Sequence, residues 1–314
     1  MGRRALALLG WWWCGAPLCG GADPLVARAP PASGGCHWRA VFHAHETEWS
    51  ETFKRRVLRA QSELGARGCG VVVVAAGVGA GVPGVGVVDG AETAAFSRRF
   101  PSLAGDLAVA KGTAGRMTRA YGGWKGDRGL ILAGALLPDV AHYWNLESDV
   151  EWKGDLYEIL SSWDERAEDL LCVDYRTTPY DWPHVAAHDG GDWLAPGDKR
   201  DCMLTVARVS TKLLEAAAAV AAESGRRAYL ELRLPSECAR HARLYSNCSA
   251  APLFAGATES RKGGLFTFAG SRRHRRFAAR SGRLADAFAA GANGTLWHPV
   301  KDRGPWALSI HKGR

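Results

Sequence analysis

Short apolar runs alternate along the chain with longer segments that have one apolar face. Continuous apolar runs are typical of strands buried on both faces of a parallel sheet, whereas a single apolar face indicates a surface helix. The runs predict strands at 36–45, 70–76, 142–149 and 169–175, and a strand or strand-to-helix entry at 228–234. Helices are predicted at 48–64, within 116–137, at 156–163 and at 210–223. This alternation predicts an α/β fold with a mixed, mainly parallel sheet flanked by helices, in a single domain.

The segment His-Tyr-Trp-Asn-Leu-Glu-Ser-Asp-Val-Glu-Trp at 142–152 begins with an apolar, aromatic-rich run. This run leads directly into two carboxylates one residue apart, Glu147 and Asp149. On a continuing strand Glu147 and Asp149 point the same way, with backbones about 6.5–7 Å apart. Ionised carboxylates at the end of a buried strand are unfavourable unless a cation meets them. The cation is either a hard divalent metal ion, which also leaves room for a diphosphate, or a nearby Lys or Arg. Parallel sheets bind ligands at the carboxyl ends of their strands, which favours the metal.

Residues 1–22 have the pattern of a secretory signal. Arg3 and Arg4 precede an apolar stretch at 5–18, and small residues follow it before Asp23. Since a membrane span needs about 20 apolar residues, we expect a cleaved signal peptide. An uncleaved signal anchor, which would attach the protein to a membrane, is the alternative. A flexible stem at 23–35 and one domain at 36–314 complete the predicted organisation.

Cysteines and glycosylation acceptors agree with a secretory protein. Six of the eight cysteines remain when Cys14 and Cys19 are set aside, which allows up to three disulfides in one of about fifteen pairings. Their spacing matches no structural zinc site. Asn247 and Asn293 each begin an N-glycosylation acceptor triplet. We therefore expect the protein in the lumen of the Golgi or the endoplasmic reticulum, or outside the cell.

The formal net charge of +8 arises largely from basic residues at 261–283. This segment is either a solvated basic surface or a patch for a nucleotide diphosphate or an acidic glycan. A nucleic-acid partner is not expected, because the N-terminal signal argues against cytosolic access. The run Gly-Ala-Gly-Val-Pro-Gly at 79–84 formally matches a dinucleotide-binding loop. Such a loop must open a helix, and the Pro- and Gly-rich continuation predicts a flexible loop here.

The segment from Trp144 to Asp155 resembles the metal-binding strand of GT-A-type glycosyltransferases. More narrowly, it resembles a eukaryotic family of glycosyltransferase-like secretory proteins with a Trp-x-x-Glu-x-Asp-Val-x-x-x-Gly-Asp segment. Further matches follow in the family's order: Asp-Leu-Leu at 169–171, Trp-x-His at 182–184, Arg-x-Ser at 208–210, Tyr-x-Glu-x-x-x-Pro-x-x-Cys at 229–238 and His-Pro-Val-Lys at 298–301. The resemblance spans roughly residues 36–301 and implies a GT-A-like, Rossmann-like fold.

The resemblance also implies a site for Mn²⁺ or Mg²⁺. Asp149 would bind the metal directly, Glu147 would act through water or the donor ribose, and His298 would complete the metal shell unless it is only a loop residue. Glu-x-Asp replaces the Asp-x-Asp typical of the fold, which is compatible because only the second carboxylate must contact the metal. The metal would neutralise charge that develops on the diphosphate. Lys301 or an arginine of the run at 272–276 would add to this, with solvent exposure as the alternative for each.

Glu231 matches the position of a catalytic acidic residue in the GT-A fold and would be the general base of an inverting reaction. Its alternative role is an ion pair with Arg233 or another arginine. Asp174 and Glu237 are the next candidates for the base. Four further residues are assigned to the ligands, each with structural packing as its alternative: His43 and His45 near the donor, and Trp182 and His184 near the acceptor.

The sequence therefore predicts a metal-dependent glycosyltransferase that moves a sugar from a nucleotide-sugar donor to a glycan or glycoprotein acceptor. Two alternatives belong to other classes of protein. One is a non-catalytic member of the same fold that binds a glycan or a protein. The other is a glycoside hydrolase that uses two carboxylates, such as Asp149 and Glu231, as acid and base. A chelator would stop the transferase but not the hydrolase.

Overall fold

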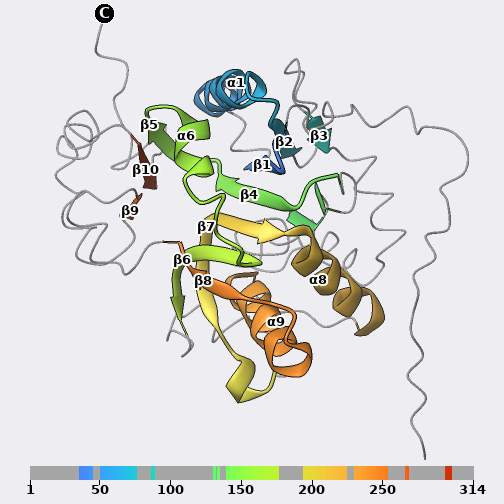
Figure 1. Cartoon of the computed structure of the whole chain (residues 1–314). Coiled ribbons are helices and arrows are strands. Elements are labelled where there is room, and N and C mark those ends of the chain that lie inside the picture. The colour runs from blue at the N-terminus through green and yellow to red at the C-terminus, as the bar shows by residue number, and fades with distance from the viewer. Residues whose placement is uncertain are drawn as a thin grey trace, which may run out of the picture.

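A seven-stranded sheet forms the centre of the protein (Figure 1). The computed structural model describes residues 35–44, 50–75, 86–88, 130–131, 133–134, 139–176, 194–224, 230–253, 266–268 and 294–298. In order across the sheet, the strands are β3 (Gly86–Val88), β2 (Gly70–Ala75), β1 (Trp38–Ala44), β4 (His142–Glu147), β7 (Asp201–Ser210), β6 (Leu170–Arg176) and β8 (Ala250–Pro252). Strand β7 is antiparallel to β4 and β6, and the other neighbouring strands are parallel. The predicted mixed, mainly parallel sheet is confirmed.

A second, three-stranded sheet has the order β5 (Glu151–Lys153), β10 (Thr295–His298) and β9 (Phe266–Phe268). Strand β10 is antiparallel to β5 and parallel to β9. Trp152 of β5 and Leu296 of β10 are fully buried in a hydrophobic cluster that also contains side chains of β1, β2 and β4. The two sheets therefore share one core, as expected for a single domain.

In the described part of the chain, helices α1 (Glu51–Gly65), α6 (Leu156–Ser161), α8 (Thr211–Ser224) and α9 (Leu230–Tyr245) cover the two faces of the large sheet. Helices α1 and α6 share a hydrophobic cluster with Phe42 and Trp144, whereas α8 and α9 pack with Val41 and Tyr143 on the other face. Strand residues alternate between the two clusters, as the two-residue period of a strand requires. Figure 1 shows the same separation of the helix pairs. A short 3₁₀ helix, η3 (Pro196–Asp198), precedes β7.

Local sequence signals explain where the predicted helices begin. In α1, the Ser50 side chain accepts a hydrogen bond of 3.2 Å from the backbone N–H of Phe53 and so caps the helix. In α8, Ser210 Oγ accepts from the N–H of Leu213 at 3.1 Å and so caps the helix. The apolar face of α1 is buried against the sheet at Phe53, Val57, Ala60 and Leu64.

The segment predicted as a strand or strand entry at 228–234 forms the first turns of α9 instead. Every residue at 231–238 is buried, including Pro235 inside the helix. A helix buried on all sides has no 3.6-residue apolar period. The alternation of Leu232 and Leu234 with polar residues therefore gave the two-residue pattern that is typical of a strand.

Two further segments differ from the prediction. Residues 86–88, expected in a loop, form edge strand β3. Strand β7 was not predicted because the polar residues Asp201, Thr205 and Arg208 interrupt its apolar pattern, although all ten of its residues are buried. Arg208 is buried where its Nη1 donates to the carbonyl oxygen of Trp163, a tertiary partner that a pattern of apolar positions does not reveal.

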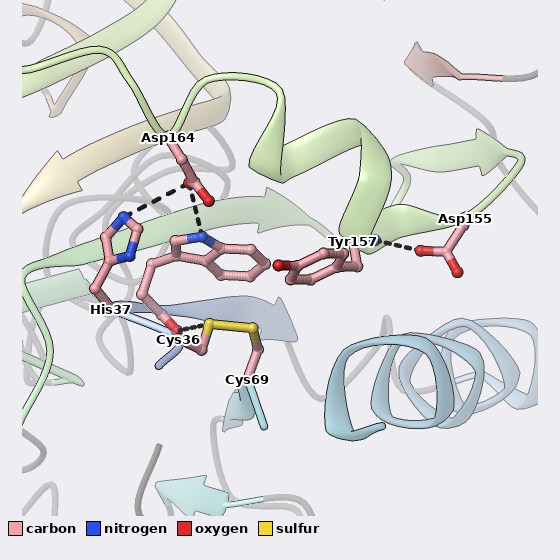
Figure 2. The surroundings of a disulfide bond; sticks show 7 residues. Cys36, His37, Cys69, Asp155, Tyr157 and Asp164 are labelled. Carbon is pink, nitrogen blue, oxygen red and sulfur yellow. Dashed lines mark hydrogen bonds and ion pairs between the residues drawn. A yellow bond between two sulfur atoms is a disulfide. The ribbon is translucent and has the colours of Figure 1, made fainter. Parts of the chain in front are cut away.

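Two disulfides are formed, Cys36–Cys69 and Cys238–Cys248, and within the described chain Cys172 and Cys202 are free and buried. The first disulfide links the residues just before β1 and β2 (Figure 2). Two of the three disulfides that the cysteine count allows are thus present.

The predicted N-terminal signal and most of the stem lie outside the described residues. None of the described helices combines the length and apolar character needed to cross a bilayer.

Replacing Gly70 with alanine tests the packing between β1 and β2. An added Cβ would overlap the guanidinium of Arg39, which is 1% exposed and donates from Nε to Asp139 Oδ1 at 3.1 Å. We expect Gly70→Ala to lower the free energy of unfolding by about 1–3 kcal/mol, measured by chemical denaturation, because the buried arginine must move. Gly197→Ala is the matched control, since nothing lies within 4 Å of its added Cβ. Equal stabilities of the two variants would contradict this packing.

Candidate functional site

The carboxyl ends of β1, β2, β4 and β6 meet at one edge of the large sheet because these strands point the same way. Antiparallel β7 begins at this edge with Asp201. Strand β4 is central, between β1 and β7, and ends at Glu147. The predicted metal-binding carboxylates therefore lie at the middle of the edge where open α/β sheets bind ligands.

Strand β4 does not continue to Asp149, so the predicted strand spacing of the two carboxylates is wrong. Ser148 and Asp149 form a turn, closed by a 3.0 Å hydrogen bond from the N–H of Val150 to the carbonyl oxygen of Glu147. The chain turns here because β5 leaves the large sheet and pairs with β10. Glu147 and Asp149 are both half-buried in this turn. We call residues 147–149 the carboxylate turn.

Arg56 of α1 holds the carboxylate turn from the side of the helix. This arginine is 4% exposed, and its Nη1 donates to the carbonyl oxygen of Ser148 at 2.7 Å. Its Nε donates to Glu151 Oε2 at 2.8 Å, so a buried ion pair lies directly beyond the turn. Sequence reasoning missed Arg56. The available signal was its position three residues after Phe53, on the apolar face of α1, where an arginine needs a buried partner.

The backbone brings two predicted histidines toward the same place. His43 on β1 is the register partner of Glu147 on β4. Trp297 on β10 is the partner of Glu151, and His298 is the next residue along β10. Strand pairing therefore places the backbones of both histidines beside the carboxylate turn and its continuation. Their side chains are not among those that the structure describes.

Glu231 lies in the first turn of α9 and is 8% exposed. Its carboxylate is near Cys202 at the start of β7. The pKa of the Cys202 thiol is raised well above its usual value, first by burial, then by the neighbouring Cys172 thiol, and then by the negative charges of Glu231 and Asp201. Cys202 is the second residue of β7, which begins at the edge where β4 ends, so the charge of Glu231 acts on that end of β7.

The structure describes Glu237 and Arg233 but not the side chain of Asp174, the other candidate for the general base. Glu237 is fully buried in α9, with its Oε2 3.4 Å from Arg240 Nη1, so a bound acceptor cannot reach it. Asp174 lies in β6, and its side chain is outside the described part. Arg233, the predicted partner of Glu231, donates from Nη2 to the carbonyl oxygen of Ala217 in α8 at 2.6 Å. It therefore helps to join α9 to α8.

The other predicted residues are only partly accounted for. Asn247 is exposed after the end of α9, next to the disulfide of Cys248. Five predicted residues lie outside the described chain: His45, Trp182, His184, Asn293 and Lys301. Among the described residues, no group of three or more His, Cys, Asp or Glu side chains is arranged to hold a metal ion.

No protein-family model and no curated protein sequence matches the chain. Among solved structures, apo mouse xyloside xylosyltransferase 1 is similar at 11% identity over 83% of this chain and 97% of that one, with a TM-score of 0.40. Glucosyl-3-phosphoglycerate synthase from Mycobacterium tuberculosis, in complex with Mn²⁺, UDP and phosphoglyceric acid, is 14% identical over 70% of this chain and 69% of that one, with a TM-score of 0.36. The Mn/GDP form of core-mannan synthase A from Aspergillus fumigatus is 8% identical over 74% and 79%, with a TM-score of 0.37.

Alkylation tests the buried surroundings of Glu231. We expect neither Cys172 nor Cys202 to react with iodoacetamide in the native protein at neutral pH, because both thiols are buried and the pKa of Cys202 is raised. Both should react once the chain is unfolded in denaturant without reductant, as peptide mapping by mass spectrometry would show. Cys238 and Cys248 are the internal control, since their disulfide blocks alkylation until it is reduced. Labelling of either free thiol in the native state would contradict the packing of α9 on β6 and β7.

Proposed function

We propose that this protein is a metal-dependent glycosyltransferase with a GT-A-like fold, which transfers a sugar from a nucleotide-sugar donor to a glycan or protein acceptor. One observation carries the proposal: the carboxylate turn lies at the carboxyl end of the central strand β4. The resemblance of residues 144–155 to the GT-A metal-binding strand assigns the same two carboxylates to the metal. Position in the fold and sequence motif thus agree on one place.

The residues at the turn fit Mn²⁺ or Mg²⁺ by their chemistry. Both ions prefer oxygen ligands, and Glu147 and Asp149 present half-buried carboxylates. In our proposal Asp149 binds the ion directly, Glu147 acts through water or the donor ribose, and His298 supplies a further ligand. When bound, the ion would neutralise negative charge on the leaving diphosphate.

Glu231 is our candidate for the general base. In an inverting reaction it would accept the proton of the acceptor hydroxyl as the hydroxyl oxygen bonds to the sugar carbon and the bond from that carbon to the diphosphate oxygen breaks. Its electrostatic effect on Cys202, near the start of β7 at the edge where β4 ends, supports this role. His43, His45 and Lys301 remain our candidates for donor binding.

We also propose that the protein works in the secretory pathway, in the Golgi or endoplasmic reticulum lumen, or outside the cell. The two disulfides support an oxidising compartment. Exposed Asn247 supports a glycan at the first acceptor triplet. Residues 1–22 would direct the chain there, as a cleaved signal peptide or as a membrane anchor.

Replacing Asp149 tests the proposed metal site. We expect UDP or GDP with Mn²⁺ to raise the melting temperature of the parent protein, since a ligand at 100 times its Kd adds about 2.7 kcal/mol of stability. Asp149→Ala should abolish this Mn²⁺-dependent shift while the protein without ligand stays folded. Glu158→Ala is the matched control, because Glu158 lies on α6 and makes an exposed ion pair with Arg67, which follows α1.

Three results would argue against the proposal. Donor binding by Asp149→Ala as tight as that of the parent would exclude the assigned metal ligand. A parent protein that no nucleotide or nucleotide sugar stabilises would favour a glycan- or protein-binding role. Activity on a glycoside that persists in excess chelator would favour the hydrolase with two carboxylates.

A further inference from the structure

Helix α1 holds the chain that follows β4 through a row of three side chains, Arg56, Arg59 and Glu63. They are spaced by three and four residues and so lie along one side of the helix. Arg59 donates from Nη1 to the carbonyl oxygen of Trp152 at 3.0 Å and from Nη2 to that of Gly154 at 2.6 Å. Its guanidinium carbon also lies 4.8 Å from the centroid of the Trp152 ring.

Glu63 continues this row toward α6. Its Oε2 accepts from Trp152 Nε1 at 2.9 Å and from the backbone N–H of Leu156 at 2.8 Å, while its Oε1 accepts from Arg59 Nε at 2.7 Å. Arg59 and Glu63 therefore fix β5 and the start of α6 to α1. Of these three described side chains, Arg56 is the one that contacts the carboxylate turn itself.

The contact from Arg56 meets the turn at the residue between the two carboxylates. Its hydrogen bond to the Ser148 carbonyl oxygen restrains the peptide unit that joins Ser148 to Asp149. The second partner of the Arg56 guanidinium is the carboxylate of Glu151, whose side chain is 9% exposed. An arginine suits this position because its planar fork donates in two directions at once, which the single ammonium group of a lysine does less well.

We propose that Arg56 is a positioning residue, which sets the relative placement of Glu147 and Asp149 and thereby the metal affinity without touching metal or donor. This inference rests on the proposed function, because the affinity in question is that of the carboxylate turn for Mn²⁺. Residues that orient metal ligands in this way typically contribute 10–100-fold to metal affinity.

The test compares Arg56→Met with Arg39→Met. Arg39 is equally buried and paired with a carboxylate, Asp139, but it lies at the start of β1, away from the carboxylate turn. Both variants should lose stability, because each removes a buried guanidinium and its ion pair, although Glu151 keeps Arg59 Nη1 at 3.6 Å. At a temperature where both are folded and with saturating UDP or GDP, only Arg56→Met should need about 10-fold more Mn²⁺ for half-maximal nucleotide binding. Arg56→Lys should recover part of that loss.

An unchanged Mn²⁺ requirement in Arg56→Met, or an equal increase in Arg39→Met, would overturn the positioning role. Hydrogen exchange of the Val150 amide, bonded to the Glu147 carbonyl oxygen, gives a readout that needs no ligand. It should be faster in Arg56→Met than in Arg39→Met, and equal rates would overturn the restraint by Arg56. If the parent protein shows no Mn²⁺-dependent nucleotide binding, the proposed function fails, whereas the exchange rates still show whether Arg56 holds the turn.

Discussion

The chain changes from one sheet to another over three residues, Ser148 to Val150, and the arrangement of the candidate site depends on this change. Strand β4 is paired on both sides, by β1 and β7, and β5 pairs with β10 in the smaller sheet. Buried Val150 and Trp152 hold the chain in the shared core just after it leaves β4. The two acidic residues at the change of sheet therefore stay at the surface of the core, half-buried, at the edge where neighbouring strands also end.

Buried arginines hold this architecture at several points. Arg56 joins α1 to the carboxylate turn, and Arg39 joins β1 to Asp139 before β4. Arg208, fully buried in β7, donates to the carbonyl oxygen of Trp163 at 2.6 Å and so ties the loop after α6 to the sheet. A buried guanidinium is tolerated only where carboxylates or carbonyl oxygens surround it, so each of these residues requires a particular arrangement of chain segments. Loops without regular structure are fixed in this way.

The sequence was informative wherever local physics decides the structure. The valines of β2 and the one-sided apolar face of α1 were predicted, because apolar runs and helical periodicity depend on neighbouring positions alone. The apolar pattern did not predict β7, whose Arg208 is buried against the carbonyl oxygen of distant Trp163, nor the start of α9, where burial on all sides removes the helical period. Both failures arise where tertiary contacts override the simple rule that polar positions face water.

For the candidate site, the sequence by itself determined which residues offer the chemistry: two acidic side chains at the end of an apolar run, and a later acidic residue, Glu231. It did not determine how they are placed. The turn at Ser148 and Asp149, the guanidinium of Arg56 behind it, and the approach of β10 with His298 come from residues far apart in the chain. Only the tertiary structure decided these three placements. A hydrogen bond between residues 56 and 148 does not change the pattern of apolar and polar positions in either segment, so the sequence pattern cannot reveal it.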